Sequence, residues 1–289
     1  MPNDTRNASR KASEPPNSDI ELDGVRLEFP GGVVALNEVN LSIRQGEFVT
    51  VIGPSGCGKT TLMRLIAGFE WPTNGSVSVG GQRVTGPDYR RGVVFQQAAL
   101  YPWMSVEDNV SLGPRSRGVE KQVWKERVRD MLELVGLADF GGHPPYQLSG
   151  GMQQRAAIAR VLVNDAPIML MDEPFGALDA LTRERLQDEL ADLWAKTGKT
   201  VILITHSIDE AVYLGERVVV MSPRPGRIIR IVDAHECNER DNLTFVDTRK
   251  QIRDLIFDGE RALVRDVSSR QTAKQSGDAT GEGNDRSTR

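Results

Sequence analysis

The sequence predicts an α/β fold with a parallel sheet at its centre, and two observations predict it. Between residues 19 and 240, short apolar runs rich in β-forming residues alternate with segments of helical periodicity. Four of these runs end at a side chain able to do chemistry: residues 48–52 before Gly53, 92–95 before Gln96, 168–171 before Asp172 and Glu173, and 201–205 before His206. Ligands of open parallel sheets bind beyond the carboxyl ends of the strands, so we expect these residues to share one site.

Helical segments accompany the strands. One stripe of apolar side chains recurs at helical spacing and stops at Gly136; its members are Trp124, Val128, Met131, Leu132 and Val135. No strand-like run surrounds it, so residues from about 98 to 160 are expected to form a mostly helical subdomain. A second stripe ends near Gly198 and comprises Leu186, Leu190, Leu193 and Trp194. We interpret both stripes as packing surfaces.

The two ends of the chain differ from this central part. Residues 1–18 and 269–289 are polar, with little to bury, and are predicted to be disordered. Between them, residues 241–268 are expected to form a C-terminal helical extension in which Ile252, Leu255 and Ile256 face inward. The sequence contains no internal repeat, which indicates one catalytic unit.

Composition restricts the classes of partner. The chain has 289 residues and a net charge of −4, from 36 basic and 40 acidic residues, so it lacks the basic excess of a nucleic-acid-binding protein. No apolar run approaches the roughly 18 to 20 residues that a membrane helix needs, and the N-terminus lacks the apolar core of a signal peptide. Cys57 and Cys237 are too few for a disulfide framework, which favours a reduced, cytosolic protein.

Residues 53–60 fit a phosphate-binding loop. They match the pattern GxxxxGK[ST] between a predicted strand and a predicted helix, and comprise Gly53, Pro54, Ser55, Gly56, Cys57, Gly58, Lys59 and Thr60, with Thr61 following. Glycines let backbone N–H groups turn toward an anion, and the helix adds its positive N-terminal end. Lys59 can reach the β- and γ-phosphates, and the Thr60 hydroxyl can coordinate Mg²⁺. The alternative is a glycine turn that binds no nucleotide.

Two acidic residues and a histidine follow other strands. Asp172 after an apolar strand fits the Walker B role of holding Mg²⁺, and Glu173 could polarise the attacking water. The alternative for both carboxylates is that they cap the next segment. A lone histidine at the position of His206 is more often a structural hydrogen-bonding residue, but its place at a strand end favours contact with the γ-phosphate. His143 and His235 have no comparable context and are expected at the surface.

The segment LSGGMQQR, residues 148–155, precedes a strongly helical run. Ser149 and the amides of Gly150 and Gly151 would open a helix N-terminus, which makes a second anion site. An ordinary N-cap would explain Ser149 but not two glycines that weaken the start of a helix.

This segment resembles the signature motif of ATP-binding cassette (ABC) ATPases, and the other landmarks of that family follow in order over roughly residues 20–235. Gln96 resembles the Q-loop glutamine, residues 177–179 the D-loop and His206 the switch histidine. Phe29 resembles the aromatic residue that stacks on adenine, although it could equally be a core side chain. The resemblance implies a P-loop NTPase of ABC ATPase type, with a mixed-sheet core and a helical subdomain.

The resemblance also implies a mechanism. ABC ATPases dimerise head to tail, so the signature residues Leu148, Ser149, Gly150, Gly151 and Gln153 of one copy would complete the ATP site at Lys59 of the other. Mg²⁺ would be held by Thr60, Gln96 and Asp172. Glu173 would act as the base in ATP hydrolysis, with Gln96 and His206 as further catalytic residues.

Any transport pathway must lie on separate chains, because no membrane span is expected. That arrangement resembles bacterial importers, in which the ATPase lies at the cytoplasmic face of the inner membrane and docks on permease subunits served by a periplasmic solute-binding protein. In the family, the region corresponding to residues 96–110 contacts the permease. The pair Pro102–Trp103, residues 172–179 and residues 224–227 resemble the nitrate/sulfonate/taurine importer group. The alternative for Trp103 is a core aromatic residue.

Two other functions compete with import. One is a non-transport ABC protein acting on DNA or ribosomes, which would usually carry a coiled-coil insertion or two tandem cassettes; the sequence shows neither. The other is the ATPase subunit of an exporter with a separate membrane subunit.

Overall fold

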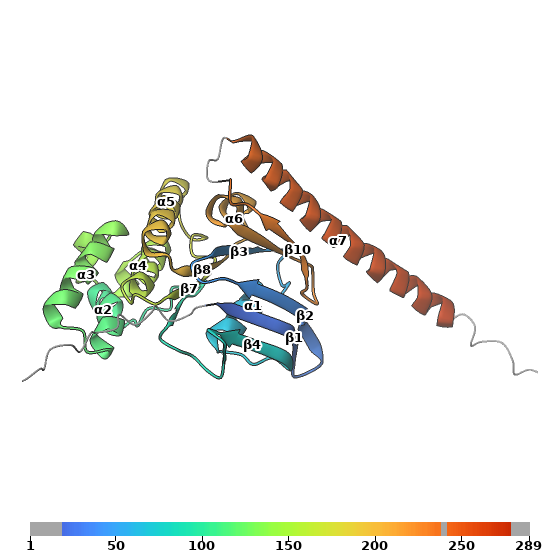
Figure 1. The fold of residues 1–289 in the computed structure, drawn as a ribbon, viewed down its shortest axis with the longest axis horizontal. Coiled ribbons are helices and arrows are strands. Elements are labelled where there is room, and N and C mark those ends of the chain that lie inside the picture. Colours follow the sequence, from blue (N-terminus) through green and yellow to red (C-terminus); the bar gives the residue numbers. More distant parts are fainter. Residues whose placement is uncertain (1–18, 238–241, 279–289) are drawn as a thin grey trace, which may run out of the picture.

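A computed structural model describes residues 19–237 and 242–278, with the backbone alone at residue 260 and at residues 262–278. The tails expected at residues 1–18 and 279–289 lie outside the described residues. Figure 1 shows a central sheet with helices around it, an antiparallel sheet beside it and a helical group at one end.

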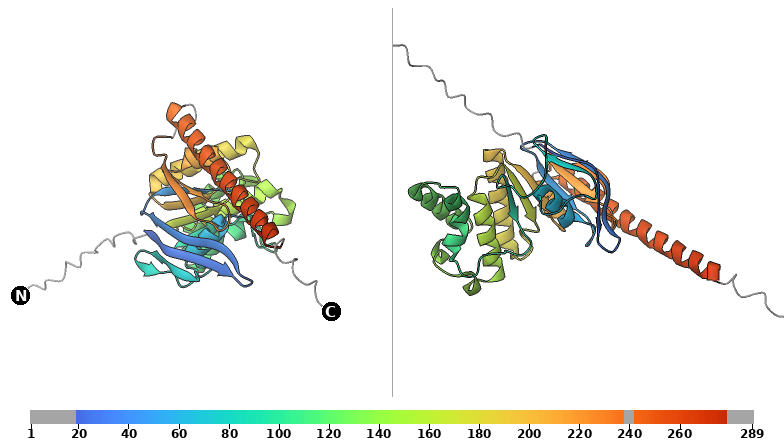
Figure 2. Two further views of the ribbon diagram at one scale, coloured as in Figure 1. Left: turned by 90° about the vertical axis from the view of Figure 1, so that its right-hand side faces the viewer. Right: turned by 90° about the horizontal axis from the view of Figure 1, so that it is seen from below.

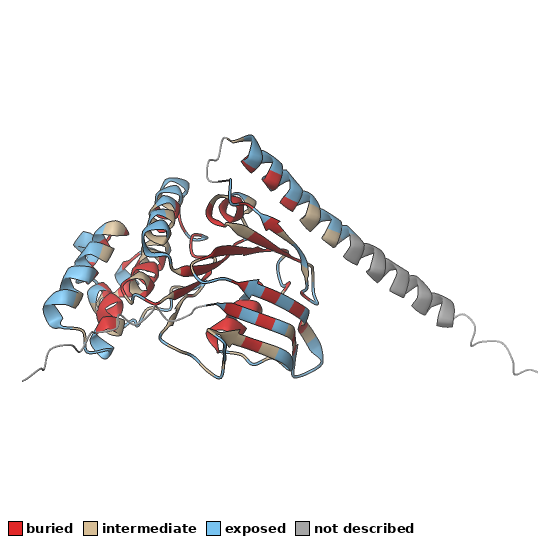
Figure 3. Cartoon of the chain, in the orientation of Figure 1, coloured by how far each residue is buried: buried red, intermediate tan, exposed pale blue. Residues whose placement is uncertain are grey.

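The central sheet is the predicted one. Its six strands lie in the order β10-β9-β3-β8-β7-β6. Five are parallel, namely β3 (Phe48–Ile52), β6 (Arg91–Val94), β7 (Ile168–Asp172), β8 (Thr200–Ile204) and β9 (Arg217–Met221), and β10 (Ile228–Asp233) pairs antiparallel at one edge. Every residue of β3, β7 and β8 is buried, as Figure 3 shows, because helices or the second sheet cover both faces. Because β3, β6, β7 and β8 are parallel, the chemically reactive residues that follow them all lie at the carboxyl end of the sheet.

A second sheet was not predicted. Four antiparallel strands lie in the order β2-β1-β4-β5: β1 (Ile20–Phe29), β2 (Val33–Ile43), β4 (Asn74–Val79) and β5 (Gln82–Arg83). The alternation of buried Ile20 and Leu22 with exposed Glu21 in β1 was the available signal for it. Helix α1 (Lys59–Ala67) lies between the two sheets, and its Leu62 and Leu65 share one core with both of them.

The expected helical subdomain is present between β6 and β7. It contains α2 (Val106–Ser116), α3 (Lys121–Leu134), α4 (Gly150–Leu162) and two short 3₁₀ turns, Ala138–Phe140 and Pro145–Gln147. In the first predicted stripe, Val128, Leu132 and Val135 are buried, and Trp124 and Met131 pack against them. Figure 2 shows this group set to one side of the sheets.

The second predicted stripe lies on α5 (Ala180–Thr197), which ends at Gly198 in the left-handed conformation. Its Leu186 and Leu190 are buried, while Leu193 and Trp194 are partly buried beside them. Helix α6 (Ile208–Leu214) follows β8 and covers the sheet near β9.

The C-terminal extension is longer than predicted. Helix α7 runs over Leu243–Asp278, so the prediction of a helical segment ending at 268 and disorder from 269 was wrong as far as Asp278. The added stretch contains no proline and many good helix formers, which explains why the backbone continues. Ile252 is fully buried against α6 and β9, with Leu255 and Ile256 beside it as expected. Within the described residues, no helix is long and apolar enough to span a membrane.

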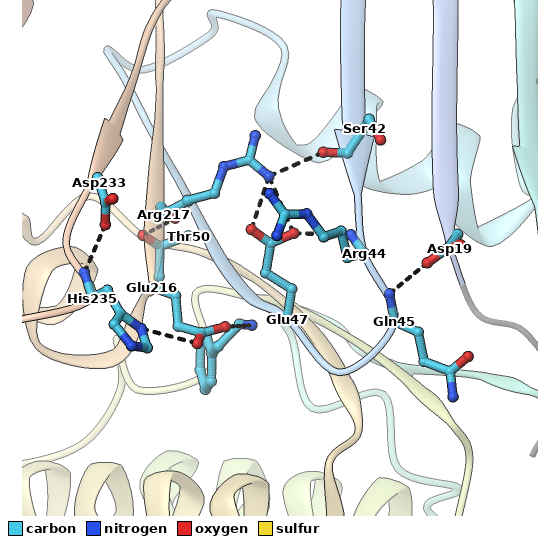
Figure 4. Close-up of polar contacts among 11 residues, drawn as sticks. Asp19, Ser42, Arg44, Gln45, Glu47, Thr50, Glu216, Arg217, Asp233 and His235 are labelled. Atoms are coloured by element: carbon cyan, nitrogen blue, oxygen red, sulfur yellow. Dashed lines mark hydrogen bonds and ion pairs between the residues drawn. The ribbon is translucent and has the colours of Figure 1, made fainter.

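A polar network ties the two sheets together at the edge opposite the reactive strand ends (Figure 4). Arg217, at the start of β9, donates to both carboxylate oxygens of the buried Glu47 at 2.8 and 3.1 Å, and to the carbonyl oxygen of Ser42 in β2 at 3.1 Å. Glu47 also accepts from the backbone N–H of Arg44 at 2.9 Å. The buried carboxylate is thus fully paired.

We expect Arg217→Ala to destabilise the fold, because it leaves the buried Glu47 carboxylate without its cation. Breaking such a pair costs about 3 kcal/mol. Urea unfolding would measure the loss, with Arg230→Ala on the exposed face of β10 as the matched control. Equal unfolding midpoints for the two variants would contradict the structural role of the pair.

Candidate functional site

The predicted phosphate loop lies between β3 and α1. Its lysine is buried, and the Lys59 ammonium donates to the carbonyl oxygens of Gly53 at 2.8 Å and Pro54 at 3.1 Å. Helix α1 has no side-chain cap at its N-terminus, so its first backbone N–H groups remain available to an anion. The local geometry is that of a phosphate cradle.

Glycine is required at position 58 for two reasons. Its φ of 102° lies in the left-handed region. A Cβ at this position would also lie 2.8 Å from Leu36 Cδ2 and 3.1 Å from the carbonyl oxygen of Ala35. Strand β2 therefore packs tightly against the phosphate loop at Gly58 and restricts its conformation.

The end of β7 brings the first carboxylate to this loop. The Thr60 hydroxyl donates to Asp172 Oδ2 at 2.8 Å. Burial raises the pKa of the Asp172 carboxyl; the hydrogen bond from Thr60 opposes this rise and the adjacent Glu173 adds to it. The two oxygen groups lie side by side at the start of α1, where the sequence predicted a Mg²⁺ site.

Glu173 joins the two remaining strand ends. Its Oε2 accepts from Gln96 Nε2 at 3.0 Å and lies 3.4 Å from His206 Nδ1. Its φ of 48° is in the left-handed region, where few non-glycine residues lie, while its N–H still donates to the carbonyl oxygen of Ile204 at 2.9 Å. The chain leaves the sheet sharply at Glu173, directly beside the phosphate loop.

Lys59, Thr60, Gln96 and Glu173 border one cleft of about 400 Å³. Asp172 and His206 do not line it but contact its lining residues Thr60 and Glu173. Its lining comprises Phe29, Val33, Ala35, Ser55, Gly56, Gly58, Lys59, Thr60, Thr61, Gln96, Glu173 and Arg224. Phe29 is 37% exposed and lies at the cleft, so the alternative of a core side chain was wrong. Gly53, Pro54 and Cys57 belong to the loop but do not line the cleft; the carbonyl oxygens of Gly53 and Pro54 accept from Lys59, and burial raises the pKa of the Cys57 thiol.

Three lining residues were missed by the sequence analysis. Val33 and Ala35 belong to the unpredicted antiparallel sheet, and Arg224 lies in the turn between β9 and β10. Proline and glycine after Arg224 indicate a turn, but nothing in the local sequence indicates that this turn reaches the cleft.

The signature residues do not line this cleft in the same chain. Ser149 caps α4 by accepting from the N–H of Met152 at 3.3 Å, so the predicted helix start is present. Gln153 Nε2 donates to the carbonyl oxygens of Pro145 at 3.0 Å and Leu148 at 3.2 Å, which places its amide within its own subdomain. Gly150 and Gly151 begin the helix, and Leu148 is buried.

Helix α4 holds the chain on both sides of Gln96. Gln154 Nε2 donates to the carbonyl oxygen of Phe95 at 3.2 Å. The Arg160 guanidinium donates to the carbonyl oxygens of Ala98 at 3.1 Å and Ala99 at 2.9 Å. These contacts, which sequence reasoning did not find, connect the helical subdomain to the cleft.

A buried network also fixes the turn that carries His206. Thr205 Oγ1 donates to Glu210 Oε2 at 2.5 Å and accepts from the N–H of Ser207 at 3.0 Å. Gln187 Nε2, from α5, donates to the other oxygen of Glu210 at 3.1 Å. The exposed His206 side chain is thus carried on a rigid turn next to Glu173.

Comparisons with known proteins agree with this site. Residues 36–176 match the family described as ABC transporter. The chain is 49% identical over 251 residues to the taurine import ATP-binding protein TauB of Jannaschia sp. (strain CCS1), which covers 83% of this chain and 94% of that protein. The chain belongs to the ABC transporter family. It is an ATP-binding subunit of this family and an ATPase. An uncharacterized ABC transporter ATP-binding protein of Methanocaldococcus jannaschii is 52% identical over 235 residues, covering 80% of this chain and 88% of that protein.

Solved ABC cassettes have the same fold. A dimeric ATP-binding cassette in a post-hydrolysis state, bound to ADP and Pi, is 35% identical with a TM-score of 0.68, covering 74% of this chain and 98% of that one. A dimeric bacterial ABC transporter cassette is 36% identical with a TM-score of 0.69, at the same coverage. The predicted fold class, a P-loop NTPase of ABC ATPase type, is confirmed.

Proposed function

We propose that this ABC ATPase powers an importer of a small anion such as taurine, another sulfonate or nitrate, through separate permease subunits. The observation that carries the proposal is the convergence of Lys59, Thr60, Gln96 and Glu173 on one cleft, with Asp172 bound to Thr60 and His206 beside Glu173. Relatives named as taurine import ATP-binding proteins support the choice of transporter.

The proposal gives each group at the cleft a role in hydrolysis. The loop amides and Lys59 bind the phosphate tail of ATP, and Phe29 stacks on the adenine. Glu173 accepts a proton from the attacking water while His206 and Gln96 hold its carboxylate in place and face the γ-phosphate. Since hydrogen bonds at such sites tighten once substrate is bound, the 3.4 Å separation between His206 and Glu173 is compatible with this arrangement.

The donor set fits Mg²⁺. Thr60 and Asp172 present a hydroxyl and a carboxylate 2.8 Å apart, and Gln96 offers an amide oxygen nearby on the same cleft. Hard oxygen ligands of this kind suit Mg²⁺, which in nucleotide sites is held by few protein groups and by phosphate. When bound, Mg²⁺ would neutralise negative charge on the β- and γ-phosphates.

A second copy of the chain would complete the site. Ser149 and the start of α4 do not line the cleft of their own subunit, and Ser149 and Gly150 are exposed. In a head-to-tail dimer this second helix N-terminus would face the γ-phosphate at Lys59 of the partner. The dimeric cassettes of similar fold support this arrangement.

The permease would dock on a groove between the sheets and the helical subdomain. This groove, of about 640 Å³, is lined by Phe69, Tyr89, Ala99, Tyr101 and Arg160 among others. Trp103, beside it, is 78% exposed, so the alternative that Trp103 is a core residue was wrong. The buried Asn109 holds the loop rigid: it accepts from the N–H of Tyr101 at 2.7 Å and donates to carbonyl oxygens of Tyr101 and Ser105.

We expect Trp103→Ala to weaken association with the permease about 30-fold, since exposed aromatic anchors dominate such interfaces. Co-purification from membranes and permease-stimulated ATP hydrolysis would measure the loss, with unstimulated hydrolysis unchanged. Phe257→Ala, an exposed aromatic residue of α7, is the matched control. Wild-type stimulation in the Trp103 variant would place the permease elsewhere.

The cargo is chosen by the solute-binding protein and permease. A neighbouring gene for a periplasmic solute-binding protein that binds taurine, another sulfonate or nitrate would support import, with this subunit at the cytoplasmic face of the inner membrane. A permease of exporter type without such a binding protein would favour the export alternative. Tight association with ribosomes or DNA and no membrane partner would overturn both.

A further inference from the structure

The turn between β9 and β10 is built as a rigid unit. The Ser222 N–H donates to the carbonyl oxygen of Arg227 at 2.8 Å, and Ser222 Oγ accepts from the Arg227 N–H at 3.0 Å. Ser222 Oγ also donates to the carbonyl oxygens of Pro223 at 3.0 Å and Pro225 at 3.2 Å. Ser222 thus hydrogen-bonds to residues along the whole turn, and the exposed Arg224 lies within this turn.

This turn is docked on the nucleotide cleft. The Gly226 N–H donates to the carbonyl oxygen of Ala35 at 2.9 Å, and the Asn37 N–H donates to the carbonyl oxygen of Gly226 at 3.0 Å. A Cβ on Gly226 would overlap the carbonyl oxygen of Cys57 in the phosphate loop. The turn therefore packs against both β2 and the phosphate loop, and glycine is needed where it meets them.

The Arg224 side chain extends from this turn to the phosphate loop. Its Nη2 lies 3.4 Å from the position that a Cβ on Gly56 would occupy, and its side chain lines the cleft. Among the described lining residues, Lys59 and Arg224 are the basic side chains. The Lys59 ammonium is engaged by loop carbonyls, whereas Arg224 makes no hydrogen bond or ion pair to any other residue in the part of the chain that the structure describes.

We propose that Arg224 is a nucleotide-binding residue that contacts the phosphate tail of the nucleotide bound in its own subunit. A guanidinium presents paired N–H donors that match phosphate oxygens, and its charge adds to that of Lys59. Its position beside Gly56, within the phosphate loop, favours phosphate over adenine. The inference rests on the proposed nucleotide site.

Arg224→Ala should weaken binding of ADP and ATP about 10- to 100-fold, the range expected for a lost charge-assisted contact. The full-length chain would be titrated with Mg²⁺-ADP, Mg²⁺-ATP and Mg²⁺-GTP in competition with a fluorescent ATP analogue, at protein concentrations where it is monomeric. Arg224→Lys should lose less than Arg224→Ala. Arg227→Ala, the other arginine of the same turn, is the matched control and should bind as wild type.

The outcomes separate the alternatives. Wild-type ADP and ATP affinity in Arg224→Ala, with loss only of ATP-dependent dimerisation, would overturn the proposal in favour of a contact with a partner subunit. A loss for ATP that is absent for GTP would overturn it in favour of adenine. Failure of the wild-type chain to bind any of the three nucleotides would instead refute the nucleotide site itself. Unfolding in urea at the wild-type midpoint would show that Arg224→Ala retains the fold.

Discussion

Glu173→Gln is expected to bind ATP while its turnover falls about 10²- to 10⁴-fold, the contribution of a positioned general base. The amide keeps the shape of the side chain and can still contact Gln96 and His206, but it cannot accept a proton from water. ATP should then remain uncleaved and hold two copies together. Steady-state hydrolysis and size-exclusion chromatography with Mg²⁺-ATP would record both effects.

Glu133→Gln, on the exposed face of α3, provides the matched control for loss of one carboxylate. It should hydrolyse ATP at the wild-type rate and show no trapped dimer. Turnover near the wild-type rate in Glu173→Gln would remove Glu173 from the role of base, and Asp172 would not replace it because its carboxylate is buried against Thr60.

The residues proposed for catalysis could be predicted because each one follows the carboxyl end of an apolar strand, directly or through the phosphate loop. Lys59, Asp172 and His206 lie far apart in sequence, yet parallel strands bring their ends to one edge of the sheet. That rule needs only the strand pattern and the direction of the strands. Their contacts with each other, including the hydrogen bond from Gln96 to Glu173, required the structure.

The parts that could not be predicted depend on packing between distant segments. Arg224 reaches the cleft because Gly226 fits between β2 and the phosphate loop, and no local pattern records that fit. The exposure of Trp103 was equally undetermined, because an aromatic residue after a proline suits either a core or an interface. The length of α7 was underestimated because polar composition was interpreted as disorder, whereas a run without proline can still be helical.

Residues 95–101 connect the cleft, helix α4 and the groove proposed for the permease. Residues 95–101 carry Gln96, which holds Glu173, and the same segment is held by Gln154 and Arg160 of α4. Helix α4 begins at the signature serine, Ser149, and the segment ends at the groove assigned to the permease. A shift of a permease docked in this groove would therefore be transmitted both to Glu173, the proposed base, and to the helix that is proposed to close the partner's site.

Two inactive variants are expected to restore hydrolysis when mixed, if each ATP site is shared between two copies. Lys59→Ala should lose nucleotide affinity, and Ser149→Arg should block closure at the start of α4; each should be inactive by itself. In a head-to-tail heterodimer of the two, both defects fall in one composite site and the other site is intact. Random pairing leaves about a quarter of all sites functional, which hydrolysis in the mixture would reveal.

Mixing Lys59→Ala with Glu173→Gln is the matched control, because both changes lie on the same side of the site. Every heterodimer of that pair has one defect in each site, so the mixture should stay inactive. A site formed within one chain predicts no recovery in either mixture, since each subunit would carry its own defect. Recovery with Ser149→Arg but not with Glu173→Gln therefore requires that Ser149 act on the Lys59 of another copy, and no arrangement within a single chain reproduces that difference.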